Sequence, residues 1–380
     1  MTACVEGDVA DTRVVVGLSG GVDSAVTALR LVEAGYQVEG LFMFNWSEDE
    51  AGRCQAADDF DDAAAVCDVL DIPLHRADFS HEYKTRVFRY FLDSYAAGRT
   101  PNPDVLCNRE IKFDAFLHHA RRLGADWIAT GHYARLVHDE RGTRLLRGAD
   151  PAKDQSYFLA AVPMAALERT LFPLGDLPKT DVRAMARRAG LPVHDKPDST
   201  GVCFIGERDF EGFLRQYLSG RAGPVRVAGG PLAGRVIGEH AGLIYYTIGQ
   251  RRGLGLGGVP GAAQAPWYVA DKDLGSDTLW VTQDAAHPAL METRLTTAAP
   301  HWLGPAPALP LRCAAQVRYR QRAIACRVTA QDSGLAVQFD HPPRAIAPGQ
   351  YAVFYDGDHC LGSAEIVTAG APAPLQSATA

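Results

Sequence analysis

The sequence lacks several features that would assign it to whole classes of protein. Only 8 of its 380 residues are cysteine and none form a C-x-x-C pair, so neither a disulfide-stabilised scaffold nor a tetrahedral zinc site is expected. No apolar run reaches the length of a membrane span. Residues 1–13 carry acids and no apolar stretch, so we expect no signal peptide. A reducing cytoplasm, without membrane attachment, is the compartment that fits.

An excess of positive charge is also missing. The formal net charge is −7, which argues against broad non-specific nucleic-acid binding, because such binding neutralises many phosphates. Local basic clusters remain, and each is by default a solvated face. They are Arg121-Arg122, Arg183 with Arg187-Arg188, Arg251-Arg252, and Arg318 to Arg322.

What the chain does contain, up to residue 218, is an alternation of apolar strands with helical patterns. This alternation predicts an α/β fold with a doubly wound parallel sheet, whose functional site lies at the carboxyl ends of the strands. The expected strands cover 14–18, 37–44, 73–79 and 126–130. The expected helices cover 25–34, 58–70, 83–97, 112–123, 181–189 (capped by Thr180 and ended by Gly190) and 209–218.

The composition changes near residue 219. A glycine-rich sequence with strand-like patterns predicts a small β-rich central domain over 219–290, including a strand at 242–248. Alternating runs after a proline-rich link, among them 313–320, predict a C-terminal antiparallel β-barrel over 291–370. We expect residues 1–218 to form the catalytic domain and 371–380 to be a disordered tail.

The stretch SGGVDS, residues 19–24, stands between the first strand and the first helix. Backbone N–H groups in such a turn form a concave anion site, and the helix dipole adds positive potential. The turn has no lysine, which excludes a Walker A loop. Ser19 and Ser24 offer hydroxyls, and Asp23 could hold a divalent metal. The alternative is a tight strand-to-helix turn with a serine cap.

Two cysteines stand in unusual contexts. If Asn108 caps a helix, Cys107 lies at the mouth of that helix with Arg109 and Lys112 nearby, and these conditions lower a thiol pKa. Cys203 lies in a polar, glycine-containing loop. A lone cysteine is usually a small buried hydrophobe, which is our interpretation of Cys4, Cys54, Cys67, Cys313, Cys326 and Cys360.

Several strings occur in order along the chain: SGGVDS, Leu41-Phe42-Met43, NPDVLCN, ATGHYA, KDQSYFL, STGVCFIGER, YTIGQRRGLG, RYRQ and PGQ. Together they resemble the bacterial tRNA-specific 2-thiouridylases, a family of N-type ATP pyrophosphatases, over about residues 13–366. SGGVDS alone would indicate only the superfamily. One departure is Phe44, where many relatives carry a lysine; it adjoins Met43 and would alter a contact near the nucleotide.

The resemblance implies ATP and Mg²⁺, with Mg²⁺ neutralising the pyrophosphate as it leaves. The implied nucleotide-binding residues are Gly17, Leu18, Ser19, Gly20, Gly21, Val22, Asp23, Ser24, Met43 and Gly131. Asn102, Pro103 and Asp104 would meet the target base, with Asp104 as a proton shuttle. Contacts to tRNA are implied for His132, Lys153, Asp154, Gln155, Arg318, Tyr319 and Gln350.

The resemblance also implies the reaction. O2 of the wobble uridine in the tRNA anticodon loop attacks the α-phosphate of ATP. Cys203 arrives as a persulfide, charged by a sulfur-carrier protein or cysteine desulfurase. Its terminal sulfur attacks C2 directly, or is released as sulfide when Cys107 attacks Cys203; a Cys107–Cys203 disulfide remains. We expect the chain to act as a monomer.

Two other functions fit parts of the sequence. An amidating or ligating pyrophosphatase, such as an NAD or GMP synthetase, shares the loop but needs ammonia and no paired thiols. A non-catalytic RNA-binding module would keep the loop only as a relic. Single residues also have simpler interpretations: His132 as a turn histidine, Lys153–Gln155 as exposed polar residues, and Arg318 with Arg320 on the outward face of a strand.

Overall fold

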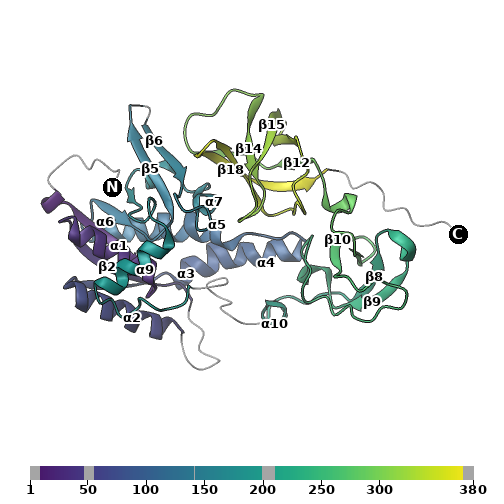
Figure 1. Ribbon diagram of the computed structural model, residues 1–380, viewed down its shortest axis with the longest axis horizontal. Helices are drawn as coiled ribbons and strands as arrows, with labels where there is room; N and C mark the ends of the chain where they lie inside the picture. Colours follow the sequence, from purple (N-terminus) through teal and green to yellow (C-terminus); the bar gives the residue numbers. More distant parts are fainter. Residues whose placement is uncertain (1–8, 47–54, 141, 199–209, 371–380) are drawn as a thin grey trace.

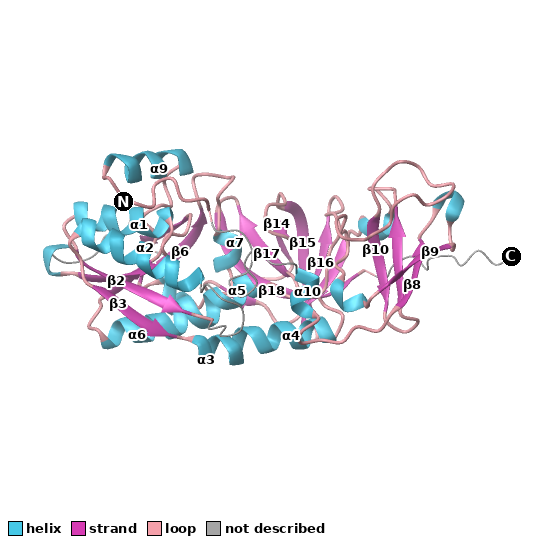
Figure 2. Ribbon diagram, turned by 90° about the horizontal axis from the view of Figure 1, so that it is seen from below, coloured by secondary structure: helices cyan, strands magenta, loops and turns pink. Residues whose placement is uncertain are grey.

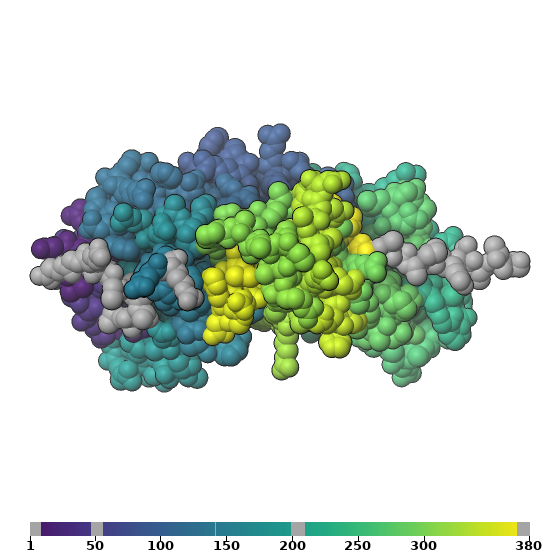
Figure 3. Space-filling view, turned by 90° about the horizontal axis from the view of Figure 1, so that it is seen from above, coloured from purple at the N-terminus to yellow at the C-terminus, as the bar shows by residue number. Residues whose placement is uncertain are grey.

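The structure is a computed structural model that describes residues 9–46, 55–140, 142–198 and 210–370. It contains three bodies (Figure 1): a helix-covered sheet, a small four-stranded sheet at the opposite end, and a barrel between them. The space-filling view shows the barrel, in light green and yellow, between the other two (Figure 3). The predicted α/β class, with a parallel-sheet domain followed by two β-rich bodies, is confirmed.

The N-terminal sheet has the strand order β3-β2-β1-β4-β7, with every pairing parallel. The order reverses between β1 and β4, and ligands of such sheets bind at that point, outside the carboxyl ends of the strands. Val14, Val15 and Val16 of β1 are fully buried, as expected for a central parallel strand. The strands are β1 (Arg13–Leu18), β2 (Gln37–Phe44), β3 (Leu74–Asp78), β4 (Trp127–Ala129) and β7 (Thr170–Leu171).

Helices cover both faces of this sheet, with α1 and α2 on one side of β2 and β3 and α6 on the other (Figure 2). The described helices without π-helical turns are α1 (Val22–Glu33), α2 (Gln55–Leu70), α7 (Ser156–Leu159), α8 (Met164–Leu167), α9 (Lys179–Arg188) and α10 (Phe210–Leu214). Of these, α10 lies away from the sheet, where Phe210 packs on Tyr95. Two longer helices contain π-helical turns: α3-η2-α4 (Ser80–Glu82, Tyr83–Phe88, Arg89–Ala96) and α5-η3-α6 (Pro103–Cys107, Asn108–Ala115, Phe116–Arg122).

The predicted cap of α9 is wrong, whereas its end is confirmed. Pro178, in an extended conformation, precedes the helix, and Thr180 lies inside the first turn without a capping hydrogen bond. Proline fits this place because it sets the chain direction and lacks an N–H. Gly190 follows the helix with φ +68°, as the sequence predicted.

The central sheet has the order β10-β11-β8-β9. The strand expected at 242–248 is absent from this described segment, which forms a 3₁₀ turn, η5 (Leu243–Tyr245). Gly242 packs on the backbone of Gly220, and the Tyr245 hydroxyl donates to the Leu218 carbonyl, so the chain folds back here. The strands are β8 (Gly223–Val227), β9 (Val236–His240), β10 (Tyr268–Asp273) and β11 (Thr278–Thr282).

The C-terminal barrel follows the order β12-β16-β15-β14-β17-β18 and closes through β12 against β18. The strand expected over 313–320 ends at Gln316, so Arg318 and Arg320 lie in a turn and not on an outward strand face. The strands are β12 (Arg294–Thr297), β13 (His301–Trp302), β14 (Leu311–Gln316), β15 (Ile324–Gln331), β16 (Gly334–Phe339), β17 (Tyr351–Asp356) and β18 (His359–Ala369).

A hairpin of the N-terminal domain extends the barrel sheet. Strand β6 (Gly142–Arg147) pairs with β18 at Leu146 and His359, and β5 (Ala134–Asp139) pairs with β6. This connection was not predicted from the sequence, because β5 and β6 are far from their barrel partner along the chain. Among the described helices, none is long and apolar enough to cross a membrane.

Candidate functional site

The SGGVDS turn joins β1 to α1 at the carboxyl edge of the sheet. The Ser24 hydroxyl accepts a hydrogen bond from the Ser19 N–H (3.2 Å) and donates to the Gly21 carbonyl (3.0 Å). Gly20 has φ +70°, and a Cβ there would lie 2.3 Å from the Asp59 carbonyl oxygen. The backbone of α2 therefore packs directly on the turn, and only glycine fits at this position.

Residues expected to border the nucleotide gather around this turn. A Cβ on Gly17 would lie 3.4 Å from Met43 Cε, and one on Gly131 would lie 2.9 Å from the Ser24 nitrogen. The ends of β1, β2 and β4 thus meet at one place, with Gly17–Ser24, Met43 and Gly131 side by side. Phe44, next to Met43, stacks against the Arg76 guanidinium, 3.9 Å from its ring centre.

The Asp23 carboxylate is held by side chains from distant segments. Lys179 Nζ, at the start of α9, donates to both of its oxygens at 2.7 and 2.8 Å, and the Tyr133 hydroxyl donates at 2.7 Å. Burial and the neighbouring Asp23 carboxylate raise the pKa of Tyr133. Both oxygens of Asp23 are therefore engaged, and in this arrangement the carboxylate is not an open metal ligand.

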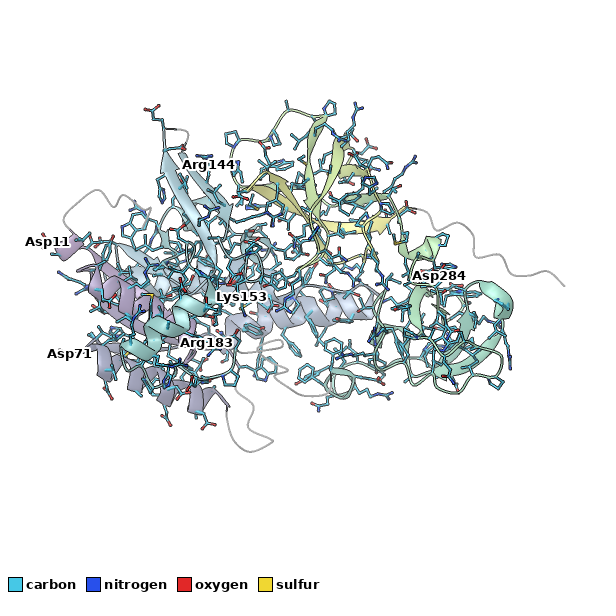
Figure 4. All side chains as sticks on the ribbon, in the orientation of Figure 1. Asp11, Asp71, Arg144, Lys153, Arg183 and Asp284 are labelled. Atoms are coloured by element: carbon cyan, nitrogen blue, oxygen red, sulfur yellow. The ribbon has the colours of Figure 1, made fainter. Side chains whose placement is uncertain are left out.

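A second carboxylate, Asp198, binds three cations beside Asp23. It accepts from Lys153 (2.6 Å), Lys179 (2.7 Å) and Arg183 (2.9 Å), and Lys153 and Arg183 lie close together in Figure 4. Partial burial alone would raise the pKa of Asp198, but hydrogen bonds from Lys153 and Lys179 lower it to about 2. The cluster of Asp23, Lys153, Lys179, Arg183 and Asp198, here called the α9 cluster, carries one net positive charge next to the turn.

Lys196 adds a further cation on the other side of the turn. Its Nζ donates to the Gly20 carbonyl (3.1 Å) and to two carboxylates of α2, Asp59 (2.6 Å) and Asp62 (2.5 Å), which together offset its charge. Asp198, two residues further along, is the last described residue before 199–209. Cys203 lies in that segment, outside the described residues. The chain leading to Cys203 is therefore anchored at the SGGVDS turn by Lys196 and Asp198.

Cys107 does not lie at a helix mouth, and the predicted cap at Asn108 is wrong. The helix begins at Pro103, and the Asn102 side chain accepts from the Val105 N–H (3.2 Å) as its N-cap. Asn-Pro is a strong start signal, because asparagine caps and proline suits the first turn. Cys107 lies within the continuous helix, is 2% exposed, and directly precedes the π-helical turn η3.

The Asn102–Asp104 segment is held by the barrel. Gln350 Nε2 donates to the Thr100 carbonyl (2.9 Å) and the Pro101 carbonyl (3.3 Å), and Gln350 Oε1 accepts from Asn102 Nδ2 (3.4 Å). Burial raises the pKa of Asp104, and the nearby Lys112 opposes that rise. A raised pKa suits a carboxyl group that passes protons near neutral pH.

Other residues expected to contact tRNA make internal contacts. His132 is buried beside Phe113 and Phe172, its Nδ1 lies 2.8 Å from Thr130 Oγ1, and burial lowers its pKa well below the usual range. The simpler interpretation of residues 153–155 as exposed polar side chains is wrong for Asp154, which accepts from Arg147 (2.9 Å) and the Gly148 N–H (3.0 Å). Gln155 Oε1 accepts from the Tyr133 N–H (3.0 Å).

Arg318 and Tyr319 lie where the three bodies meet. Arg318 Nη2 donates to the Ile248 carbonyl of the central domain (2.7 Å). The Tyr319 ring lies 4.3 Å from that of Phe158, whose carbonyl accepts from Asn108 Nδ2 (3.2 Å). The barrel turn and the helix of Cys107 are therefore linked through Phe158.

Comparison with known proteins identifies the family. The chain is 54% identical to the tRNA-specific 2-thiouridylase MnmA of Xanthomonas campestris pv. campestris (strain B100) over 368 residues, which is 96% of either chain. It is also 54% identical to the enzyme of the same name from Chromohalobacter salexigens, over 93% of this chain and 92% of that one. The chain belongs to the tRNA-specific 2-thiouridylase family.

Three family models match this member of the family in succession. They are described as tRNA methyl transferase HUP domain (residues 12–207), tRNA methyl transferase PRC-barrel domain (211–283) and aminomethyltransferase beta-barrel domain (292–366). The tRNA thiolase NcsA from Methanococcus maripaludis and NMN synthetase from Francisella tularensis are similar in structure to only 52% and 53% of the chain. NcsA is 18% identical with a TM-score of 0.35, and 63% of its chain is covered. NMN synthetase is 18% identical with a TM-score of 0.33, and 72% of its chain is covered.

Sequence reasoning missed several residues of this site. All of them lie more than 100 residues from the glycine-rich turn along the chain: Tyr133, Lys179, Lys196 and Asp198. One signal was available for Lys179: a cation in the first turn of a helix opposes the helix dipole, and such a position usually has another purpose. Here the purpose is to pair with Asp23 and Asp198.

Proposed function

We propose that this chain catalyses the ATP-dependent 2-thiolation of the wobble uridine of tRNA. Identity of 54% over nearly the whole length to named 2-thiouridylases carries this proposal, because a ligase sharing only the SGGVDS turn would match the first domain alone. The two cysteines, the turn and the segments around Asn102 and Arg318 all lie within the matched length.

The first step is adenylation. ATP is the substrate, and its phosphates would lie on Gly17–Ser24, where backbone N–H groups and the α1 dipole favour anions. O2 of the uridine attacks the α-phosphate and pyrophosphate leaves. The α9 cluster, which contains Lys179, supplies one net positive charge beside that leaving group. Lys196, paired with Asp59 and Asp62, holds the Gly20 carbonyl. The adenylated uridine then carries AMP at O2, which makes C2 the electrophilic atom.

The second step transfers sulfur. The terminal sulfur of a Cys203 persulfide attacks C2, AMP departs, and Cys107 attacks Cys203 Sγ, leaving 2-thiouridine and a Cys107–Cys203 disulfide. In the alternative order Cys107 attacks first and releases sulfide, which attacks C2. Asp104, three residues before Cys107 on the same helix, would move the uridine and thiol protons.

Mg²⁺ fits this site only as an ion carried by the nucleotide. Among the described residues, no group of three or more His, Cys, Asp or Glu side chains could hold a metal, and Asp23 is paired with Lys179. Mg²⁺ is ordinarily bound by one or two carboxylates plus phosphates and water. When bound, it would offset the charge of the leaving pyrophosphate.

The tRNA contacts would come from the sheet domain and the barrel. Arg318 and Tyr319 would meet the anticodon stem and loop, with His132, Lys153–Gln155 and Gln350 shaping the entrance to Asp104. A persulfide donor, either a sulfur-carrier protein or a cysteine desulfurase, must reach Cys203. We expect a cytoplasmic monomer, because tRNA is the substrate and one chain supplies every proposed residue.

Mass spectrometry of tRNA nucleosides from a thiouridylase-deletion strain tests the proposal. The chain is expected to restore 2-thiouridine, Cys203→Ser to restore none and carry no persulfide, and Cys107→Ser to carry a persulfide without turnover. Cys67→Ala is the matched control, because burial raises the pKa of that thiol to about 11 and keeps it inert. Thiolation by a Cys107→Ser/Cys203→Ser double variant would refute the mechanism.

ATP–pyrophosphate exchange with the same variants, beside the mass spectrometry, separates the other functions. A synthetase would tolerate Cys203→Ser in ATP–pyrophosphate exchange with its own acceptor, and a relic module would show no exchange at all. Restoration of 2-thiouridine by the wild-type chain rejects both.

A further inference from the structure

Two thiols of the barrel face each other across neighbouring strands. Cys313 of β14 and Cys326 of β15 are direct partners in the antiparallel register, and their Sγ atoms are 3.8 Å apart. Directly opposed residues in such strands have Cα atoms about 4.5–5.5 Å apart, within the range of about 4.4–6.8 Å that disulfides span. Side-chain rotation alone can therefore bring the two sulfurs to bonding distance.

The two thiols differ in access and in acidity. Cys313 is partly exposed, whereas Cys326 is fully buried with Val328 and Phe339 in the barrel core. A hydrogen bond from Cys326 lowers the pKa of the Cys313 thiol, and the same bond together with burial raises the pKa of Cys326. Arg312, which pairs with Asp340, also favours the Cys313 thiolate. Cys313 is therefore the thiol that solvent reaches and that ionises first.

Cys313 and Cys326 also lie on either side of the turn that carries Arg318 and Tyr319. Strand β14 ends at Gln316 and β15 begins at Ile324, so the turn between them carries Arg318 and Tyr319. A bond between Cys313 and Cys326 would close a ring around that turn, at the base of the hairpin that presents it. Sequence reasoning treated both residues as inert because each was taken alone.

We propose that Cys313 and Cys326 form a reversible dithiol–disulfide site, oxidised by a small-molecule disulfide such as oxidised glutathione. The Cys313 thiolate attacks one glutathione sulfur, forms a mixed disulfide and releases one glutathione thiolate. The Cys326 thiol then attacks Cys313 Sγ and passes its proton to the departing glutathione thiolate, so the second glutathione leaves as a thiol. Two protein thiols are oxidised, and one glutathione disulfide is reduced to two thiols.

The test uses the whole protein equilibrated in glutathione buffers of increasing oxidised fraction, alkylated and digested with trypsin. Cleavage after Arg312, Arg318, Arg322 and Arg327 separates the two cysteines onto peptides 313–318 and 323–327. The expected result is one cross-linked peptide pair that grows with the oxidised fraction and disappears with excess dithiothreitol.

Two variants check the order of steps. Cys313→Ser is expected to abolish the cross-link and leave Cys326 unmodified in the folded protein. Cys326→Ala is expected to trap glutathione on Cys313, because the resolving thiol is gone; a thermal melt confirms that this core variant folds. Peptides that stay separate in fully oxidised glutathione, or a cross-link formed only between two molecules on a non-reducing gel, would overturn the proposal.

Discussion

The α9 cluster and the turn after β14 hold their cations in opposite ways. In the α9 cluster, Lys179 is 11% exposed in its side chain and pairs with both Asp23 and Asp198. In the turn, and within the described part of the chain, no carboxylate pairs with Arg318, Arg320 or Arg322. A cation neutralised inside the protein positions its neighbours, whereas one without a carboxylate is available to an external phosphate.

The largest effect is expected in the α9 cluster. Lys179→Ala is expected to slow tRNA-dependent ATP–pyrophosphate exchange by on the order of 100-fold, because it removes a buried positive charge beside the leaving group. It also leaves two neighbouring carboxylates, Asp23 and Asp198, with fewer partners. Exchange of labelled pyrophosphate, with kcat and KM resolved, measures the effect.

A control on the same helix makes that result specific. Arg187 pairs with Asp195 in an exposed position, with side chains 66% and 72% accessible, and exposed pairs contribute little. Arg187→Ala is expected to stay within about twofold of wild type. Equal rates for Lys179→Ala and Arg187→Ala would show that the cluster has no part in adenylation.

The next effect concerns Gln350, which belongs to neither region and contacts Thr100, Pro101 and Asn102. Gln350→Ala is expected to lower the thiolation rate by about 10-fold, because small misplacements of reacting groups are costly and Gln350 fixes the backbone before Asp104. Single-turnover thiolation with saturating ATP measures it. Gln338→Ala, an exposed change on the outer barrel wall, is the control, and a similar rate for both variants would contradict a positioning role.

A smaller effect is expected in the turn. Arg318→Ala should weaken tRNA binding several-fold and reduce the salt dependence by about one phosphate contact, with little change in ATP affinity. Filter binding at several salt concentrations gives both values. Arg327→Ala, exposed on β15, is the matched control. If Arg318→Ala changes neither affinity nor slope, Arg318 only joins the barrel to the Ile248 carbonyl.

The smallest effect concerns a contact away from both regions. Lys272 Nζ donates to the Gly98 carbonyl (2.6 Å) and the Tyr246 carbonyl (2.9 Å), and burial lowers its pKa to about 8 from 10.5. Between those pH values the unfolded chain binds more protons than the folded one, so folding stability should rise with pH there. Thermal melts from pH 7.5 to 10 should show this rise in wild type and not in Lys272→Met; parallel curves would refute it.

Local sequence patterns predicted the parts of the site that follow each other along the chain. The SGGVDS turn, the strands around it and the glycine after α9 depend on short-range backbone geometry, which the residues themselves encode. The start of the Cys107 helix was misplaced because Asn102-Pro103 and Asn108 are both plausible caps. Tertiary packing of Phe113, Ile111 and Leu106 favours the longer helix.

Long-range partners could not be derived in the same way. Nothing near Asp23 in the sequence indicates Lys179 or Tyr133, and nothing near Asn102 indicates Gln350. Such pairs follow from the packing of α9 and the barrel on the sheet. The pairing of β6 with β18 is of the same kind, since strand patterns show which residues form strands but not which strands meet.

The pairing of β6 with β18 has a consequence for the design of truncated proteins. A fragment ending near residue 218 would keep β6 but lose its neighbour β18, and would leave Tyr90 and Arg99 without the Glu365 carboxylate that both contact. An uncovered strand edge recruits other chains. The sheet domain expressed alone should therefore precipitate, while a shortened chain that keeps the barrel and omits the central domain would still have that edge covered.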